Sequence, residues 1–273
     1  MRDTRNLPLV SVIMPAYNCE AYVADALDSV IRQTYPNLEV IIVDDHSSDK
    51  TWGIIQDFAK QDKRIKPLRN DENLKIVGTL NRAIRHSTGK YLARMDGDDV
   101  RELDSINKQV AFLESNPTII MVGGSVEFCD EHMQRLNDRH YPLTDAEIRK
   151  KLLRYSPFCH ASLVFRSDKL EKDPYRNNWA EDYDLYFRLA KVGEMANLPD
   201  VLYHVRTHKA SVSRSKTRYQ EKLTLYLRLK AVFEYGYTMT FGDKLYFAAQ
   251  LTTMYMMPSG FRFWLFNKIR AAR

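Results

Sequence analysis

The sequence predicts an α/β protein in which a mostly parallel central sheet is flanked by helices and followed by a helical C-terminal extension. In the first third of the chain, short apolar runs alternate with segments of helical periodicity. This alternation is the pattern of βαβ units, whose strands are buried on both faces. After about residue 215, the chain changes to helical segments rich in Tyr, Phe, Met and basic residues. We therefore expect one domain over residues 1–215 and an extension over residues 216–273.

Each element is predicted from a short apolar run or from apolar residues at helical spacing. The first expected strand, residues 9–14, is stopped by Pro15, and residues 20–33 follow with Val23, Leu27 and Val30 on one helical face. The further strands are expected at residues 40–43, 65–68, 91–95, 119–122, 162–165 and 201–205. The further helices are expected at residues 50–60, 77–86, 104–115, 145–155, 182–192, 216–235 and 244–257.

The composition is that of a globular protein long enough to bury a substantial core. Of the 273 residues, 44% are hydrophobic and 28% are charged, which excludes disordered, collagen-like and coiled-coil chains. The three cysteines, Cys19, Cys129 and Cys159, follow no CxxC pattern. We therefore expect neither a disulfide scaffold nor a zinc module, and a reducing compartment fits. No signal peptide and no apolar run of about 18 residues is recognisable, so we predict a cytoplasmic protein without a transmembrane helix.

Positive charge is concentrated toward the C-terminus. The chain has a formal net charge of +6, and residues 201–273 carry 13 Lys and Arg against 3 Asp and Glu. Residues 1–200 are therefore net negative. A basic tail attracts nucleic acid, anionic lipid or a phosphorylated substrate, and charge alone does not choose among them.

Polar residues follow three of the expected strands. Pro15-Ala-Tyr-Asn18 follows the first strand, Asp44-Asp45 the second and Asp96-Gly-Asp-Asp99 the fourth. Ligands of open α/β sheets bind beyond the carboxyl ends of the strands. We therefore expect the three segments to face one crevice.

Two carboxylates flank a glycine in the last of these segments. Hard cations such as Mg²⁺ or Mn²⁺ are held by one or two carboxylates together with substrate phosphates, so Asp96 and Asp98 indicate a metal–diphosphate site. The alternative is a solvated turn, because Asp-Gly and Asp-Asp are common turn pairs. The sequence contains neither a Walker loop nor a dinucleotide fingerprint. Metal and side chains would therefore carry the phosphate charge.

Three other polar segments allow both a functional and a structural role. A carboxylate of Asp44-Asp45 could accept from a nucleobase or a ribose hydroxyl, whereas residues 47–49 favour capping of the next helix. Glu181-Asp182 begins an amphipathic helix, where the two acids could favour the helix dipole or supply a general base. Residues 203–214 combine Arg, His and hydroxyl groups, which suit anionic oxygens or a metal but also a basic loop that leaves the sheet.

Taken together, these segments resemble the family 2 glycosyltransferases, inverting enzymes with a GT-A fold that use nucleotide-diphosphate sugars. The resemblance covers about residues 8–215. The matching stretches are Val10-Ser-Val-Ile-Met-Pro-Ala-Tyr-Asn18, Val43-Asp-Asp-His-Ser-Ser-Asp-Lys-Thr51, Asn81-Arg-Ala-Ile84 with Gly89-Lys-Tyr91, Met95-Asp-Gly-Asp-Asp99 and Glu181-Asp182. Their joint occurrence at these spacings is far more specific than any single motif.

The resemblance implies how the donor is held. The residues that would line its nucleotide pocket are Pro15, Ala16, Tyr17, Asp45 and Lys75. Asp96 and Asp98 match the DxD motif, which contacts the ribose and the metal-bound diphosphate. The adjacent Asp99 offers a second register for the metal ligand, and the implied ion is Mn²⁺ or Mg²⁺.

The resemblance also implies the catalytic residues. Asp182, with Glu181 beside it, would be the base that deprotonates the acceptor hydroxyl. Arg206 and His208 resemble the family's late loop that closes over the diphosphate, with His208 as a further metal ligand. The QxxRW motif of processive members is absent, so a single addition is expected rather than polymer synthesis.

The expected activity is inverting transfer of a hexose from a nucleotide-diphosphate sugar, with a UDP-sugar favoured. The acceptor would be a glycan or a lipid-linked precursor of a cell-envelope polysaccharide. A lipid-linked acceptor would make attachment of the C-terminal helices to the anionic inner face of the cell membrane useful. Alternatively, the aromatic side chains of the extension pack on the catalytic domain or on a second subunit.

Two other functions compete with sugar transfer. A sugar-phosphate nucleotidyltransferase can share this sheet, but it needs a glycine- and cation-rich triphosphate loop that residues 15–18 do not provide. A nucleic-acid-binding protein would fit the positive net charge. Its known motifs are absent, and the basic surplus lies away from the acidic strand ends, so no nucleic acid partner is expected.

Overall fold

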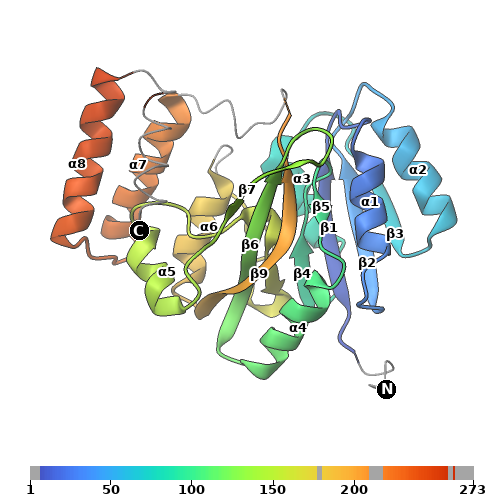
Figure 1. The fold of residues 1–273 in the computed structure, drawn as a ribbon, viewed down its shortest axis with the longest axis horizontal. Helices are drawn as coiled ribbons and strands as arrows, with labels where there is room; N and C mark the ends of the chain where they lie inside the picture. Colours follow the sequence, from blue (N-terminus) through green and yellow to red (C-terminus); the bar gives the residue numbers. More distant parts are fainter. Residues whose placement is uncertain (1–6, 177–179, 209–217, 258–260, 262–273) are drawn as a thin grey trace.

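A computed structural model describes residues 7–176, 180–208, 218–257 and 261, and these residues form one mixed α/β fold around a nine-stranded sheet (Figure 1). The strand order is β3-β2-β1-β4-β8-β6-β9-β5, and β7 pairs with β6. The strands are β1 Val10–Ala16, β2 Leu38–Asp44, β3 Ile65–Arg69, β4 Tyr91–Arg94, β5 Val100–Arg101, β6 Ile119–Cys129, β7 Arg135–Arg139, β8 Val164–Arg166 and β9 Glu194–Arg206.

The sheet is mostly parallel, as predicted. Strands β1 to β4 pair in parallel, and so do β6 and β9. The antiparallel strand β8 joins these two groups because it lies between β4 and β6. The short strand β5 and the hairpin strand β7 are also antiparallel to their neighbours. The carboxyl ends of β1, β2 and β4 therefore lie at the same edge, as the sequence predicts.

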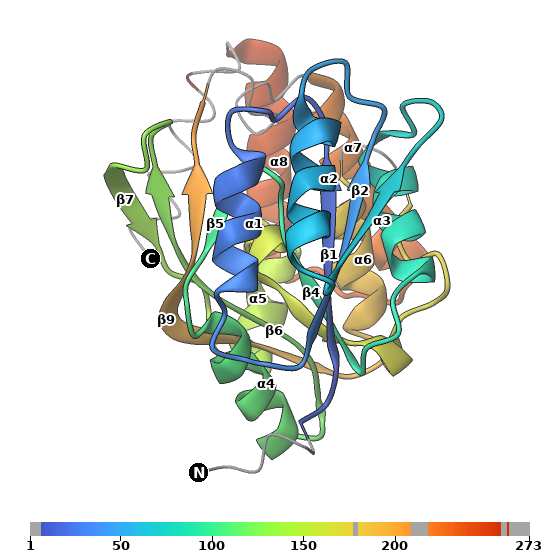
Figure 2. The same ribbon diagram turned by 90° about the vertical axis from the view of Figure 1, so that its right-hand side faces the viewer.

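Helices cover both faces of the sheet (Figure 2). Alternating residues of β1 point to opposite sides: Val12 packs in one core with α1, α2 and α4, and Ile13 packs in the other with α3, α5, α6 and α7. This alternation is the two-residue period of a strand. The helices are α1 Val23–Ile31, α2 Thr51–Gln61, α3 Lys75–Arg85, α4 Ser105–Ser115, α5 Asp145–Leu152, α6 Glu181–Leu189, α7 Arg218–Phe233 and α8 Phe241–Met256.

The structure confirms the predicted helices and strands but moves several of their ends. Strand β1 continues through Pro15, because β4 stops pairing with β1 at Arg94 and no ladder hydrogen bond is needed from residue 15 on that side. Strands β6 and β9 are much longer than expected and pair along most of their length. The sequence did not predict β5 and β7, because both are short and lack an apolar run.

The helices α7 and α8 form a pair that packs on the rest of the molecule (Figure 1). The buried Arg228 of α7 donates from Nε to Tyr183 Oη of α6 at 3.0 Å. Arg154, just after α5, forms an ion pair with Asp243 of α8 at 2.6 Å. In the described part of the chain, no helix combines the length and apolar character needed to cross a bilayer. The expected aromatic segment beyond residue 261 and most of the loop after His208 lie outside the described residues.

Candidate active site

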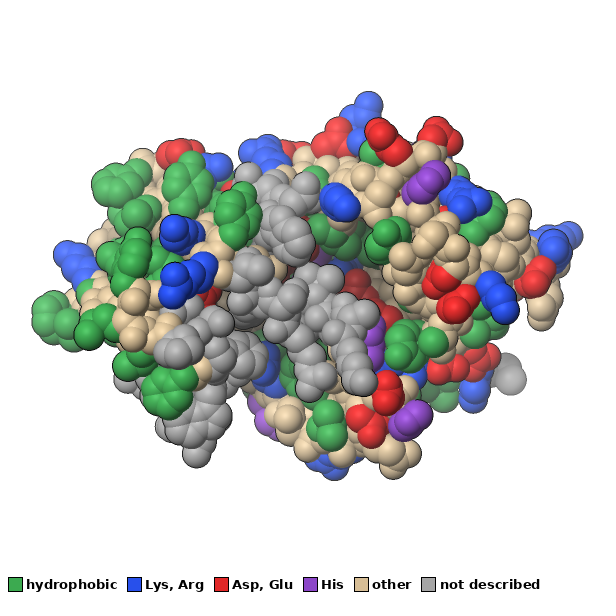
Figure 3. Space-filling model, turned by 90° about the horizontal axis from the view of Figure 1, so that it is seen from above, with side chains coloured by type: hydrophobic (Ala, Val, Ile, Leu, Met, Phe, Trp, Pro, Cys, Tyr) green, Lys and Arg blue, Asp and Glu red, His purple; other side chains and the backbone are tan. Residues whose placement is uncertain are grey.

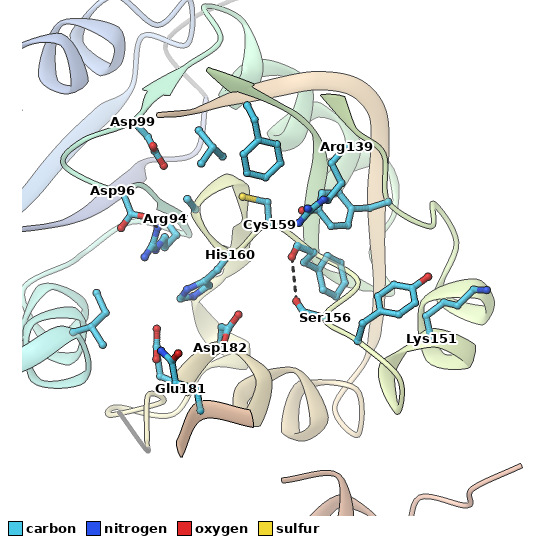
Figure 4. Close-up of a pocket in the computed structure, with 18 of the residues that line it drawn as sticks. Arg94, Asp96, Asp99, Arg139, Lys151, Ser156, Cys159, His160, Glu181 and Asp182 are labelled. Atoms are coloured by element: carbon cyan, nitrogen blue, oxygen red, sulfur yellow. Dashed lines mark hydrogen bonds and ion pairs between the residues drawn. The ribbon is translucent and has the colours of Figure 1, made fainter. Parts of the chain in front are cut away.

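A large cleft opens at the carboxyl ends of β1, β2 and β4 and continues toward α5 and α6 (Figure 4). Its volume of about 2860 Å³ exceeds that of typical small-molecule pockets, about 300–1,000 Å³. The cleft therefore has room for two substrates side by side. Every site residue predicted from the sequence lines this one cleft: Pro15, Ala16, Tyr17, Asp45, Lys75, Asp96, Asp98, Asp99, Glu181, Asp182, Arg206 and His208.

The loop after β4 gathers three carboxylates. Oxygens of Asp96, Asp98 and Asp99 lie within 4.8 Å of one another. Strand β9 helps to hold this loop, because the backbone N–H of Asp96 donates to Tyr203 Oη at 3.0 Å. Oxygen donors at this density are the ligand set that Mg²⁺ and Mn²⁺ prefer. The residues present therefore fit the divalent cation that the DxD resemblance implies.

The electrostatics of the loop also favour a cation. Burial and the charge of Asp96 raise the pKa of Asp98, and its hydrogen bond with His208 opposes that rise. Burial and the charges of Asp98 and Asp96 raise the pKa of Asp99 well above its usual value. Both shifts mean that the negative charges are poorly compensated by the protein itself. A bound cation would remove this repulsion.

The end of β9 holds the acidic loop in place. The backbone N–H of Arg206 donates to Asp99 Oδ1 at 2.7 Å, and its Nε donates to Asp98 O at 2.9 Å. Its Nη2 reaches Asp25 Oδ2 at 2.8 Å. His208 Nε2 lies 2.9 Å from Asp98 Oδ2. The structure thus joins Arg206 and His208 to the acidic loop, and the Arg206 guanidinium is largely occupied by protein acceptors.

The predicted nucleotide residues line the cleft next to the acidic loop, where Gly97 lies close to Pro15 and Ala16. Pro15 and Ala16 end β1, and Tyr17 follows with 53% of its surface exposed. The buried Asp45 accepts from Asn70 Nδ2 at 2.7 Å and from the backbone N–H of Leu74 at 2.8 Å. These bonds orient the carboxylate. An exposed aromatic ring beside a fixed carboxylate can stack on a nucleobase and accept its N–H groups.

Two acids begin α6 on the far side of the cleft from the acidic loop (Figure 4). Burial and the charge of Asp182 raise the pKa of Glu181 to about 7. The pair therefore resists carrying two negative charges. One carboxylate able to take a proton near neutral pH is what general-base catalysis requires. A helix cap alone does not explain the burial of Glu181, although the N-terminal position also favours acids.

Two residues that are not among the predicted site residues, Arg94 and His160, lie between the acid pair and the acidic loop (Figure 4). Arg94 is 4% exposed, and its Nη1 forms an ion pair with Asp96 Oδ2. His160 Nε2 is 2.8 Å from Tyr175 Oη. Burial and the Arg94 charge hold the pKa of His160 well below its usual value. The signal for Arg94 was present, because an arginine inside an otherwise apolar strand is rarely buried without a partner.

The mixed α/β sheet and the acidic cleft at its carboxyl edge are the arrangement of a glycosyltransferase of GT-A fold. The family model of glycosyl transferase family 2 matches residues 11–173. The chain belongs to this family, and it is a glycosyltransferase. Family membership favours sugar transfer over the nucleotidyltransferase and nucleic-acid-binding alternatives.

Relatives and solved structures agree with this assignment. The putative glycosyltransferase EpsE of Bacillus subtilis (strain 168) is 36% identical over 220 residues, which cover 78% of each chain. The UDP-Glc:alpha-D-GlcNAc-diphosphoundecaprenol beta-1,3-glucosyltransferase WfaP of Escherichia coli is 28% identical over 219 residues, 77% of this chain and 82% of WfaP. The crystal structure of S. aureus TarS 1–349 in complex with UDP-GlcNAc matches with a TM-score of 0.66 at 21% identity, covering 89% of this chain and 71% of that one. This last similarity supports the GT-A fold.

Proposed function

We propose that this glycosyltransferase transfers one sugar from a nucleotide-diphosphate sugar, with a UDP-sugar favoured, to a hydroxyl group and inverts the anomeric centre. The observation that carries the proposal is the convergence of the acidic loop and the Glu181–Asp182 pair on one cleft from opposite sides. Single displacement needs this arrangement, because the acceptor must attack from the face opposite the leaving diphosphate. An α-linked donor would then give a β-linked product.

The acidic loop and the acid pair would divide the chemistry between them. Asp96, Asp98, Asp99 and His208 would hold Mg²⁺ or Mn²⁺, which when bound supplies Lewis-acid stabilisation of the leaving diphosphate. Asp182 would accept the hydroxyl proton as the acceptor oxygen approaches the anomeric carbon. Arg206 would support the donor by keeping Asp98 and Asp99 in position. Holding both substrates in one cleft removes the entropic cost of bringing them together.

The cleft supports an acceptor that carries negative charge as well as a hydroxyl. Arg139 of β7 and Lys151 of α5 line the cleft on the side away from the acidic loop (Figure 4). Neither takes part in an ion pair with any described residue. Cations in this position suit the phosphate or diphosphate of a lipid-linked saccharide. WfaP, whose name states a diphosphoundecaprenol acceptor, makes this acceptor class a reasonable choice for a polysaccharide pathway.

The C-terminal helices would bring the cleft to the surface where such an acceptor resides. Hydrophobic side chains, with basic side chains among them, gather over α7 and α8 on the left of Figure 3. Phe233, Phe241 and Tyr255 are 81%, 77% and 70% exposed. Exposed aromatics beside cations are typical of helices that lie in an anionic membrane interface. A peripheral position on the inner face of the cell membrane follows as part of this proposal.

A thermal-shift panel tests the donor site. The full chain is heated with UDP, GDP, dTDP and CMP and with their sugar conjugates, each with Mn²⁺, Mg²⁺ or EDTA. A ligand that binds the folded state at 100 times its Kd stabilises it by about 2.7 kcal/mol, so the donor should stand out. We expect a shift with UDP-sugars that requires the metal, and a much smaller shift for Asp98→Asn. A metal-dependent shift that Asp98→Asn keeps would remove Asp98 from the metal site, and no shift with any nucleotide would overturn the donor proposal.

A further inference from the structure

A second group of metal-ligating side chains lies outside the active-site chemistry, where β6, β9 and β5 run side by side. Among the described residues, Glu127, Cys129 and His204 bring a carboxylate oxygen, a thiol sulfur and an imidazole nitrogen within 4.8 Å of one another. The parallel register of β6 and β9 explains this, because Glu127 pairs with His204 and Cys129 is two residues further on the same face. Nothing in the proposed sugar transfer uses these three groups.

The distances within this Glu–Cys–His cluster match those between ligands of one tetrahedral ion. Glu127 Oε1 lies 3.2 Å from His204 Nδ1 and 3.4 Å from Cys129 Sγ. Zinc bonds of about 2.0–2.3 Å place neighbouring ligands of a tetrahedron about 3.3–3.7 Å apart. The donor atoms are therefore already close to their separations in a zinc site.

A carboxylate outside the cluster orients the histidine as metal sites require. Glu102 Oε2, next to β5, lies 2.9 Å from His204 Nε2. A carboxylate that accepts from Nε2 is a common outer-shell partner of a metal-bound histidine, because this hydrogen bond leaves Nδ1 unprotonated for the ion. Here Nδ1 then faces a carboxylate oxygen of Glu127. Two acceptors at this distance need a proton or a cation between them.

The remaining groups around the cluster are compatible with a cation. The second oxygen of Glu127 forms an ion pair with Arg135 Nε at 3.2 Å, which leaves Oε1 for the ion. Burial raises the pKa of the Cys129 thiol to about 11, so the thiol keeps its proton until a metal displaces it. The side chains of Glu127 and His204 are each 20% exposed, so water can reach the fourth position.

We propose that Glu127 Oε1, Cys129 Sγ and His204 Nδ1 bind Zn²⁺, with Glu102 as the positioning residue for His204. Thiolate and imidazole ligands favour Zn²⁺ over Mg²⁺, whereas the carboxylate oxygens of the acidic loop favour Mg²⁺ or Mn²⁺. Binding would release the thiol proton and any proton on Nδ1, so affinity should fall as pH falls.

The position suggests what the ion would do. The backbone N–H of Thr207 donates to Cys129 O at 2.8 Å, directly beside Arg206 in the register. A zinc ion here would tie the end of β9 to β6. This strand end carries Arg206 and His208 to the acidic loop. The site would therefore be structural, and it is independent of which sugar is transferred.

Cobalt substitution tests the site in the full-length protein. The chain is purified, stripped with a chelator and titrated with Co²⁺, whose thiolate charge-transfer band appears only when a sulfur is bound. We expect one equivalent of Co²⁺ to give this band and one equivalent of Zn²⁺ to remove it. The acidic loop offers no sulfur of its own. Cys19→Ser and Cys159→Ser are the matched controls, because the charge of Asp98 acts on the Cys19 thiol and the charges of Asp99 and Asp96 act on the Cys159 thiol.

The variants decide the outcome. Cys129→Ser and His204→Ala should abolish the band, and Glu102→Gln should weaken Zn²⁺ binding by about 10- to 100-fold, as loss of an outer-shell partner does. Cys19→Ser and Cys159→Ser should leave the band unchanged. Absence of the band in the folded wild type, its survival in Cys129→Ser, or its loss in Cys19→Ser or Cys159→Ser would each overturn the proposal. If Cys129→Ser does not fold, the Glu102→Gln titration tests the site instead, and an unchanged Zn²⁺ affinity in that variant would overturn the proposal.

Discussion

The guanidinium of Arg94 lies buried against the carboxylate of Asp96, with Nη1 and Oδ2 in ion-pair contact. Its Nε has no hydrogen-bond partner among the described residues. A buried cation is stable here because carboxylates surround it on two sides of the cleft, the acidic loop above and the Glu181–Asp182 pair below. Arg94 therefore links the acidic loop electrostatically to the Glu181–Asp182 pair, which contains the proposed base.

Replacing Arg94 should impair both halves of the site. In Arg94→Met, Asp96 loses its partner and the nearby carboxylates become harder to ionise. Because Asp96 is a proposed metal ligand, we expect kcat/KM to fall by about 10- to 100-fold, as for loss of an outer-shell partner. Arg94→Lys should recover part of it. The acid limb of the pH profile should move to higher pH in Arg94→Met, and a loss of activity with unchanged pH dependence and metal affinity would mean a packing role only.

The Asp182→Asn variant should separate chemistry from donor binding. The amide keeps the shape of the side chain but cannot accept the hydroxyl proton, so kcat should fall by about 10²- to 10⁴-fold. The thermal shift produced by the metal and UDP-sugar should stay close to that of the wild type. Transfer at the wild-type rate in this variant would exclude Asp182 as the base.

The pH dependence should depend on Glu181. Its pKa is raised to about 7 by burial and by the charge of Asp182, so the pair takes up a proton as pH falls through this value. Activity should therefore decline below about pH 7. In Glu181→Gln the neighbouring charge is gone, Asp182 ionises more readily, and the acid limb of kcat/KM should move to lower pH. An acid limb that stays in place would assign it to another group.

The sequence predicted the alternating half of the fold well because its strands are continuous apolar runs such as Val40–Val43. It was less successful after residue 119, where strand ends depend on pairing between distant segments. Strand β9 extends over residues 194–206 because β6 runs beside it. The apolar pattern of one segment does not show which distant segment it pairs with.

For the site, motif spacing identified the residues that chain order places at strand ends, such as Asp45, Asp96 and Asp98. Arg94 and His160 were not among the predicted site residues, because their positions in the cleft depend on what surrounds them in three dimensions. The Glu127–Cys129–His204 cluster was equally invisible, since its third member lies on a different strand far along the chain. A cluster formed by the pairing register of two distant strands can be recognised only once the structure is known.

The exposed apolar surface of α8 should bind anionic membranes. Phe241 and Tyr255 are exposed on α8, whose charged residues are Asp243, which is buried, and Lys244. Burying two aromatic rings in an interface contributes about 25 cal/mol per Å² of apolar surface, while lysines nearby add about 1 kcal/mol each on an anionic surface.

The double variant Phe241→Ser/Tyr255→Ser should therefore lose most of its co-sedimentation with vesicles of phosphatidylglycerol and phosphatidylethanolamine. Leu136→Ser on β7, which removes a side chain 57% exposed, is the matched control and should sediment like the wild type. Raised salt should release the wild type only in part, because salt does not screen the contribution of the aromatic side chains. Equal recovery of the wild type and both variants in the supernatant would contradict membrane binding and leave α8 as a surface for protein contact.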